Sequence, residues 1–172
     1  MKKAFLLLML IIAPILIFAG NNKSSSQKVV LAYKIKNLNI NLDGKLTEQI
    51  WQSEPIKNFI QRDPVEGAAS TEKTEVWIAY DDNNLYVAAH LYDTKPETID
   101  ASLARRDGYT NSDWFGFYVD AFNDKRTGNY FGVNAGGTMV DGVLFNDSWD
   151  DGTWDGVWEA KTFIDETGWF VE

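Results

Sequence analysis

Three tryptophans stand in polar neighbourhoods that suit ligand binding: Trp114, Trp149 and Trp154. The C–H groups of a pyranose ring pack on an indole, whereas its hydroxyls need paired donors and acceptors. A saccharide site therefore combines an exposed aromatic ring with Asp, Asn or Arg side chains. The sequence is compatible with such a site at each tryptophan. An alternative stays open for Trp149 and Trp154, since either ring can fold back to close one end of the domain.

Two adjacent arginines are conspicuous in this acidic chain, Arg105 and Arg106, and Asp107 follows them. Guanidinium groups are forked donors, which can bind sugar hydroxyls or the carboxylate of an acidic sugar. Alternatively the arginines form an internal network of salt bridges that pins a loop to a sheet. The candidate partners in that network are Asp113, Asp120 and Asp141.

Oxygen ligands of the kind that calcium prefers gather in two loops. One loop contains Asp120, Asn123 and Asp124, and the other spans residues 147–155. Neither loop has the spacing of an EF-hand, and acidic loops are often only solvated. A structural calcium ion is thus the one cofactor that the sequence suggests.

No catalytic constellation is predicted on this segment. His90 is the only histidine, it falls in the middle of a predicted strand, and no motif supports a Ser-His-Asp set around it. Glycosidase chemistry needs two carboxylates at a set separation. With 25 acidic residues in the chain, that criterion selects no particular pair.

Composition limits the class of protein. The chain has 172 residues and no cysteine, so disulfides and thiolate metal sites are excluded. A formal net charge of −9 argues against nucleic acid, which needs a basic surface. The seven Trp, seven Tyr and ten Phe residues are expected to build a core, with Trp51, Trp77, Trp158 and Trp169 as packing residues.

The first 19 residues have the character of a secretory signal peptide. Lys2 and Lys3 precede a short apolar run that ends in small residues, and we expect cleavage near Ala19. An uncleaved anchor is the alternative. Residues 20–27 are a polar linker, and 28–172 form the domain. The protein is therefore expected to be exported, in the periplasm or in association with the cell surface and outer membrane.

Apolar and polar residues alternate in two central segments, 114–122 and 129–135, which predicts two strands around a polar loop. Trp114 and Tyr118 share one face of the first strand, and Tyr130 lies on the corresponding polar face of the second. Other strands are predicted at residues 29–35, 38–42, 74–80, 85–92, 139–145, 157–164 and 169–172, with short helices at 46–51 and 96–104 and a loop at 146–156.

Short strands at regular spacing predict an all-β fold, an antiparallel β-sandwich with one or two short helices. The last predicted strand stops soon after it begins and leaves an edge unpaired. We therefore expect the sequence to be the front part of a longer protein, with the sandwich missing its last strands.

Three blocks carry a resemblance to a known family: INLDGKLTEQIW from Ile40, YDDNNLYVA from Tyr80 and SDWFGFYVD from Ser112. At this spacing they resemble carbohydrate-binding module family 9 and its relatives. The pattern around Arg105 and the run DKRTGNYF from Asp124 are similar to a branch in which such a module opens a long exported protein. The later part of proteins in that branch resembles an outer-membrane barrel.

The resemblance implies a non-catalytic β-sandwich that binds oligo- or polysaccharides, often attached to an O-glycosyl hydrolase that serves polysaccharide breakdown. In the family, two aromatic rings clamp a terminal sugar, and structural calcium can be present. Tyr109 and Trp114 lie nearest to the first ring, whereas the family's acidic sugar contact falls at Gly116 and the second ring falls beyond Glu172. The alternative function is a periplasmic interaction domain, docked on the barrel, that has lost the sugar site.

Overall fold

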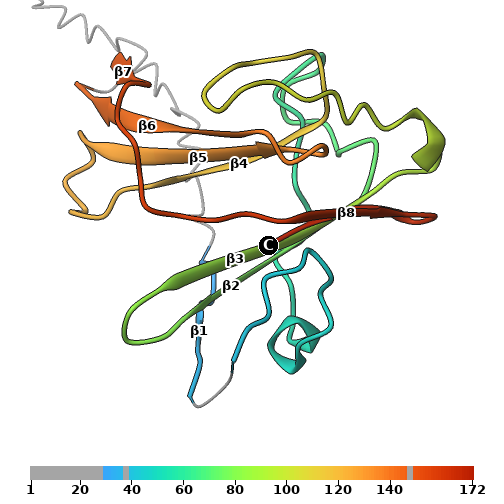
Figure 1. Cartoon of the computed structure of the whole chain (residues 1–172), viewed down its shortest axis with the longest axis horizontal. Coiled ribbons are helices and arrows are strands. Elements are labelled where there is room, and N and C mark those ends of the chain that lie inside the picture. The colour runs from blue at the N-terminus through green and yellow to red at the C-terminus, as the bar shows by residue number, and fades with distance from the viewer. Residues whose placement is uncertain (1–28, 37–38, 147–148) are drawn as a thin grey trace, which may run out of the picture.

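The computed structural model describes residues 29–36, 39–146 and 149–172, and it shows two β-sheets packed face to face (Figure 1). Only two short 3₁₀ turns accompany the strands in this part of the chain. The predicted all-β sandwich is therefore confirmed. The predicted signal peptide and linker lie outside the described residues. None of the helical turns that are described has the length and apolar character of a membrane span.

The first sheet has five strands in the order β1-β2-β3-β9-β8. Their bounds are Tyr33–Lys34 for β1, Thr74–Tyr80 for β2, Leu85–Tyr92 for β3, Thr162–Asp165 for β8 and Gly168–Val171 for β9. The short β1 runs parallel to β2, and the other neighbours are antiparallel.

The second sheet is a meander of four antiparallel strands, β4-β5-β6-β7. It consists of β4 (Trp114–Val119), β5 (Gly128–Asn134), β6 (Met139–Phe145) and β7 (Trp149–Asp151). Strands β4 and β5 confirm the predicted central pair, and β2, β3 and β6 have the predicted bounds. In these segments apolar and polar residues alternate without interruption. This alternation is typical of a strand with one buried face, and it fixes the register in which the strand pairs.

Several predicted elements are shorter than expected. Of the strand predicted at 157–164, only the last residues belong to β8, and the predicted strand at 29–35 contributes only Tyr33–Lys34. The helices reduce to 3₁₀ turns at Gln49–Gln52 and Pro96–Thr98. The second turn ends early because the Asp100 carboxylate accepts the N–H of Ser102, which turns the chain.

Two further predictions on the path of the chain are wrong. Residues 39–42 form no strand, while 37–38 lie outside the described residues. The loop predicted at 146–156 contains β7, whose Trp149 and Asp151 pair with the end of β6. The segment lacks an alternating apolar pattern, so its pairing depends on the neighbouring strand edge rather than on its own sequence.

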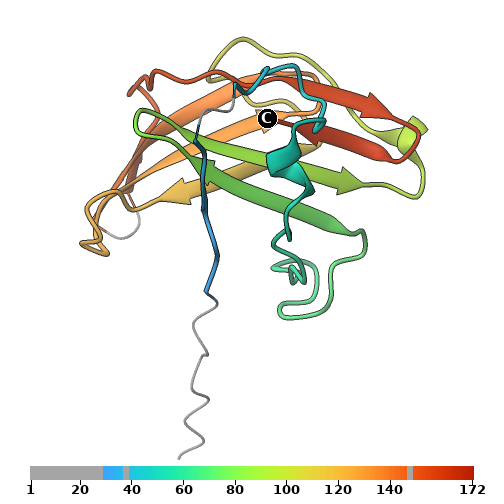
Figure 2. The same cartoon turned by 90° about the horizontal axis from the view of Figure 1, so that it is seen from below.

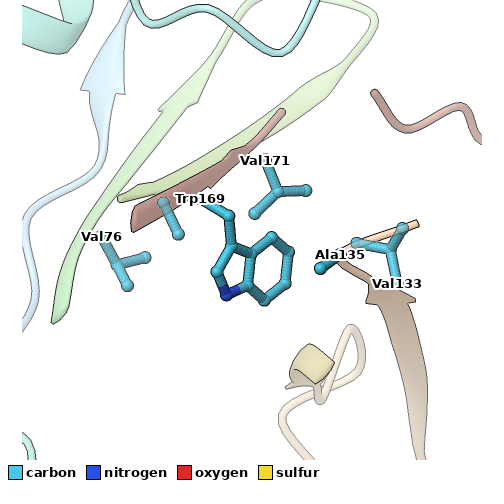
Figure 3. Packing of buried hydrophobic residues seen from close by; sticks show 6 residues of the cluster. Val76, Val133, Ala135, Trp169 and Val171 are labelled. Carbon is cyan, nitrogen blue, oxygen red and sulfur yellow. The ribbon is translucent and has the colours of Figure 1, made fainter. Parts of the chain in front are cut away.

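The main core lies between the sheets. Its buried residues come from β2, β3, β5, β9 and the residue after β5, namely Val76, Ala89, Val133, Ala135, Trp169 and Val171. In Figure 3 the indole of Trp169 occupies the space between the two sheets, with Val76 and Val171 on one side and Ala135 on the other. Trp169 is thus a packing residue, as predicted.

A second cluster covers the outer face of the first sheet. The turn at Gln49–Gln52 lies across these strands (Figure 2) and buries Trp51, which is 3% exposed. Trp51 packs near Trp77, and its indole Nε1 donates to Glu172 Oε1 at 2.9 Å. The Glu172 carboxylate also accepts the backbone N–H of Gly44 at 2.8 Å. One buried carboxylate therefore ties the early part of the chain to β9.

Candidate functional site

The outer face of the second sheet carries aromatic side chains around an open floor. Phe115 packs against the inter-sheet core, so the alternate residues of β4, Trp114, Gly116 and Tyr118, face away from the core. Tyr118 is 74% exposed. In the register of β4 and β5, Gly116 stands directly opposite Gly132. Two adjacent strands thus leave their backbone uncovered at the same point.

These residues enclose a depression of about 310 Å³. Its floor is the glycine pair together with Val140 of β6, which is the cross-strand partner of Gly132. The lining side chains at its rim are aromatic: Tyr109, Trp114, Tyr118 and Tyr130. The surface is concave rather than flat, because the glycine pair has no side chains and large aromatic rings stand on either side of it.

The rings form two pairs, one at each end of the glycine floor. The centroids of Tyr109 and Trp114 are 5.3 Å apart with planes tilted by 44°, and those of Tyr118 and Tyr130 are 6.2 Å apart with a tilt of 49°. The indole Nε1 of Trp114 donates to the carbonyl of Thr110 at 3.1 Å. This bond fixes the orientation of the indole before any ligand arrives.

The ring of Tyr130 lies against β6 at Gly142. A Cβ atom at Gly142 would come within 2.5 Å of the Tyr130 ring and hydroxyl, and one at Gly152 would lie 3.1 Å from that hydroxyl. Glycine at position 142 therefore allows the ring to lie close to the sheet. The tyrosine forms a wall of the depression rather than projecting into solvent.

Two tyrosine hydroxyls of the depression, those of Tyr109 and Tyr130, have raised pKa values and remain protonated at neutral pH. The pKa values of Tyr109 and Tyr130 are raised by burial first, and then by nearby acidic groups, which include Asp150 and Asp107. Tyr118 acts on the pKa of Tyr109, and Tyr109 on that of Tyr130. The hydroxyls thus lie within electrostatic reach of one another, and each can both donate and accept a hydrogen bond.

Arg106 is the centre of an ion-pair network around Asp141 of β6, whose cross-strand partner is the inner-face residue Phe131. Its Nη2 binds Asp141 Oδ1, and its Nε lies 3.4 Å from Asp155 Oδ1 and 3.6 Å from Asp107 Oδ2. Asp141 is 1% exposed, and its second oxygen accepts the N–H of Gly156. Among the partners that the sequence left open, Asp141 pairs with Arg106.

The other two candidate partners have different contacts. Asp113 accepts the N–H of Asp100, and Asp120 accepts the N–H groups of Asp124 and Lys125. Arg105, whose carbonyl accepts the N–H of Gly108, is exposed. The two neighbouring arginines therefore have different environments, and only Arg106 has a salt bridge among those found in the described residues.

Three of the described carboxylates, those of Asp107, Asp141 and Asp155, gather around the guanidinium of Arg106. Oxygens of Asp107, Asp141 and Asp155 lie within 4.8 Å of one another, but the guanidinium of Arg106 contacts all three and supplies the cation. The predicted calcium ligand Asp124 accepts the N–H groups of residues 126 and 127. Its oxygens thus cap their own loop, as those of Asp120 do, and we derive no calcium-dependent step from them.

Trp149 and Trp154 lie away from the depression. In the register of β7, Trp149 pairs with Phe145, on the face opposite to its neighbour Asp150. Trp154 is 36% exposed and meets the inner-face ring of Phe131 edge-on, with centroids 6.2 Å apart. The structure therefore brings Tyr109 and Trp114 together, but neither of the two other candidate tryptophans.

Trp154 instead lines an apolar groove of about 890 Å³ between β3 and the extended segment 154–160. Trp158 also lines it and packs edge-on against Phe131 at 5.3 Å. The indole Nε1 of Trp158 is buried without a hydrogen-bond partner among the described residues. Trp158 is thus a packing residue as predicted, although it lies outside a strand.

His90 lies on the other sheet, remote from these features. It is 9% exposed and is stacked between Tyr92 and Phe170, with ring centroids at 3.6 and 3.9 Å. Its Nε2 is 3.0 Å from Thr167 Oγ1. The side chain is a packed residue of the sheet face, and the Thr167 hydroxyl beside it donates to Asp165 Oδ1.

Sequence reasoning missed three components of the depression: Tyr118, Tyr130 and Gly132. The available signal was alternation, which places Trp114, Gly116 and Tyr118 on one face of the same strand. The family resemblance marks Gly116 only as the loss of an acidic sugar contact. In the structure its lack of a side chain opens the floor.

Comparison of the chain with family models, curated proteins and solved structures gave no match.

Proposed function

We propose that this chain is a non-catalytic carbohydrate-binding module of an exported protein. The observation that supports the proposal is the concave outer face of β4, β5 and β6, where two pairs of aromatic rings flank a bare glycine floor. The resemblance to carbohydrate-binding module family 9 supports the same function. Attachment to a glycoside hydrolase that degrades polysaccharide is part of this proposal.

The depression offers the two kinds of contact that a saccharide needs. The faces of Tyr109 and Trp114 present apolar surface to the C–H groups of a pyranose, and the glycine floor lets the sugar approach the backbone closely. The hydroxyls of Tyr118 and Tyr130 supply donors and acceptors for sugar hydroxyls. Since the indole of Trp114 is held by its hydrogen bond to Thr110 and the ring of Tyr130 lies against Gly142, these two side chains lose little entropy when the sugar arrives.

Isothermal titration of the domain against xylo- and cello-oligosaccharides, with and without calcium, tests this function. We expect saturable binding that falls by about tenfold or more in Trp114→Ala and Tyr118→Ala, because each substitution removes one stacking surface. Trp149→Ala is the matched control, since it removes an exposed tryptophan on another face. Loss of binding in Trp154→Ala but not in Trp114→Ala would move the site to the inter-sheet groove.

A second candidate function is an interaction domain of an outer-membrane protein, and the apolar groove favours it. Residues 85–87 of β3 pair with β2 on one side, whereas β9 pairs only with residues 89–92 on the other. An extended strand of a partner polypeptide would continue the β3–β9 ladder over the groove. If no sugar binds to the folded domain, hydrogen exchange at residues 85–87 is the next measurement, and protection only in the native assembly would support docking.

A further inference from the structure

The charges beside the depression are predominantly negative. The register of β6 and β7 pairs Asp150 with Leu144, two residues along β6 from Gly142, so Asp150 lies on the same face as the Tyr130 wall. At the other end the N–H of Asp107 binds the carbonyl of Met139, which begins β6. The carboxylate of Asp150 therefore lies on the face of the depression, and Asp107 lies near the start of β6, where its carboxylate pairs with Arg106.

The ion-pair network around Arg106 does not neutralise this negative charge. Arg106 is shared among Asp107, Asp141 and Asp155. One guanidinium thus has three carboxylate neighbours, and the carboxylate of Asp150 adds a further negative charge on the face of the depression. After burial and the neighbouring tyrosine, the carboxylates of Asp150 and Asp107 also raise the pKa values of Tyr109 and Tyr130.

An aromatic depression with a negative rim is suited to a positive ligand. An ammonium group is attracted to the faces of Trp and Tyr rings, and the attraction grows when the site is partly desolvated. Tyrosine hydroxyls and carboxylates accept the hydrogen bonds of an ammonium group, which is a donor only. The carboxylate of a uronic acid would meet Asp107 and Asp150 as like charges and find Arg106 already engaged.

We propose that the depression selects saccharides of amino sugars, which carry a free ammonium group, over neutral saccharides and over those of uronic acids. The inference rests on the proposed function, since it names the class of sugar for the same site. The aromatic rings bind the pyranose faces, and the acidic rim supplies the preference. Because the glycine floor has no side chains, it obstructs neither the sugar ring nor its ammonium substituent.

Four tetrasaccharides of similar size test this inference by titration at about pH 6, where an amine of this type is protonated. They are the glucosamine tetrasaccharide, its fully N-acetylated form, cellotetraose and tetragalacturonate. We expect the glucosamine form to bind about tenfold more tightly than cellotetraose. Tetragalacturonate should give no measurable binding. The preference should decrease as salt is added, because the rim carboxylates are near the surface.

Asp150→Asn and the double variant with Asp107→Asn should bring the glucosamine and neutral tetrasaccharides to within about twofold of each other. Glu166→Gln, at the turn between β8 and β9, is the control, because it changes the net charge equally at a distance from the depression. Equal binding of charged and neutral sugars by the unsubstituted domain overturns the inference and leaves the proposed function standing. Absence of binding to all four by folded protein overturns the function itself.

Discussion

Gly116 of β4 and Gly132 of β5 are direct cross-strand partners on the outer face of the second sheet. The backbone is consequently bare between the pair Tyr109–Trp114 and the pair Tyr118–Tyr130. The concave shape of the candidate site depends on this glycine pair, because any side chain at either position would project into the space between the rings.

Gly116→Val is expected to block the depression while the domain stays folded. A Cβ atom at this position meets the Phe131 carbonyl oxygen at 3.2 Å, a tight contact, and valine is favourable in strands. We expect saccharide affinity to fall by more than about tenfold and stability to change by about 1 kcal/mol. Calorimetric titration and urea denaturation measure the two effects. Retained affinity in the folded variant would show that ligands bind elsewhere.

Arg106→Met is expected to destabilise the domain by about 3 kcal/mol. The side chain of Asp141 is fully buried, so removal of its guanidinium partner leaves a buried charge that only the Gly156 N–H still compensates. Arg105→Met is the matched control and should change stability by no more than about 0.5 kcal/mol. Urea denaturation of both variants checks the prediction, and equal small effects would mean that the network does not stabilise the loop.

Trp51→Phe removes the hydrogen bond that ties the early turn to β9. Glu172 would keep its backbone donors at Asp43 and Gly44 but lose the indole N–H, and we expect a loss of about 2 kcal/mol. Trp149→Phe, which changes an exposed indole, serves as the control. In the variant, hydrogen exchange at the Gly44 amide should accelerate. Unchanged exchange there would indicate that the carboxylate does not anchor this segment.

His90 gives the domain a pH dependence of defined sign. Burial lowers its pKa, against the opposing charges of Asp165 and Glu75. The unfolded chain therefore takes up a proton at a higher pH than the folded one, and stability falls as the pH drops below about 6.5 towards the lowered value. NMR titration of this single histidine measures its pKa directly. His90→Phe should flatten the stability profile over that interval, whereas a steeper fall would contradict the assignment.

The alternation of apolar and polar residues predicted the strands that carry the site, because one face of each strand is buried in the core and the other is exposed. Phe115 goes to the core, and Trp114 and Tyr118 go outward, so the hairpin of β4 and β5 follows from sequence alone. Tyr109 and Trp114 are each predicted as sugar-binding residues, and the structure brings their rings into contact. Their place in a depression depends on Gly132 and Tyr130, which only the cross-strand register brings opposite to Gly116 and Tyr118.

The tryptophans of the acidic loop show where sequence reasoning stops. Polar neighbours surround Trp149 and Trp154 alike, but the position of each ring depends on the path of segment 149–160 past the edge of β6. That path is set by tertiary contacts, the Asp141 carboxylate on the N–H of Gly156 and the ring of Phe131 on Trp154. Tertiary contacts also determine the partner of Arg106. The sequence predicts three candidate carboxylates, and of these Asp141 pairs with Arg106 in the structure.

Alternate residues of β4 and β5 have different roles, because they lie on opposite faces of the sheet. Odd positions such as Phe115 and Phe117 face the space between the sheets, and even positions such as Trp114 and Tyr118 line the outer depression. Evolution can therefore exchange one set while conserving the other. New ligand preferences can arise by single substitutions along Tyr109 to Tyr130 without a search for a new core, and the same separation makes this meander a convenient scaffold for selecting binders in the laboratory.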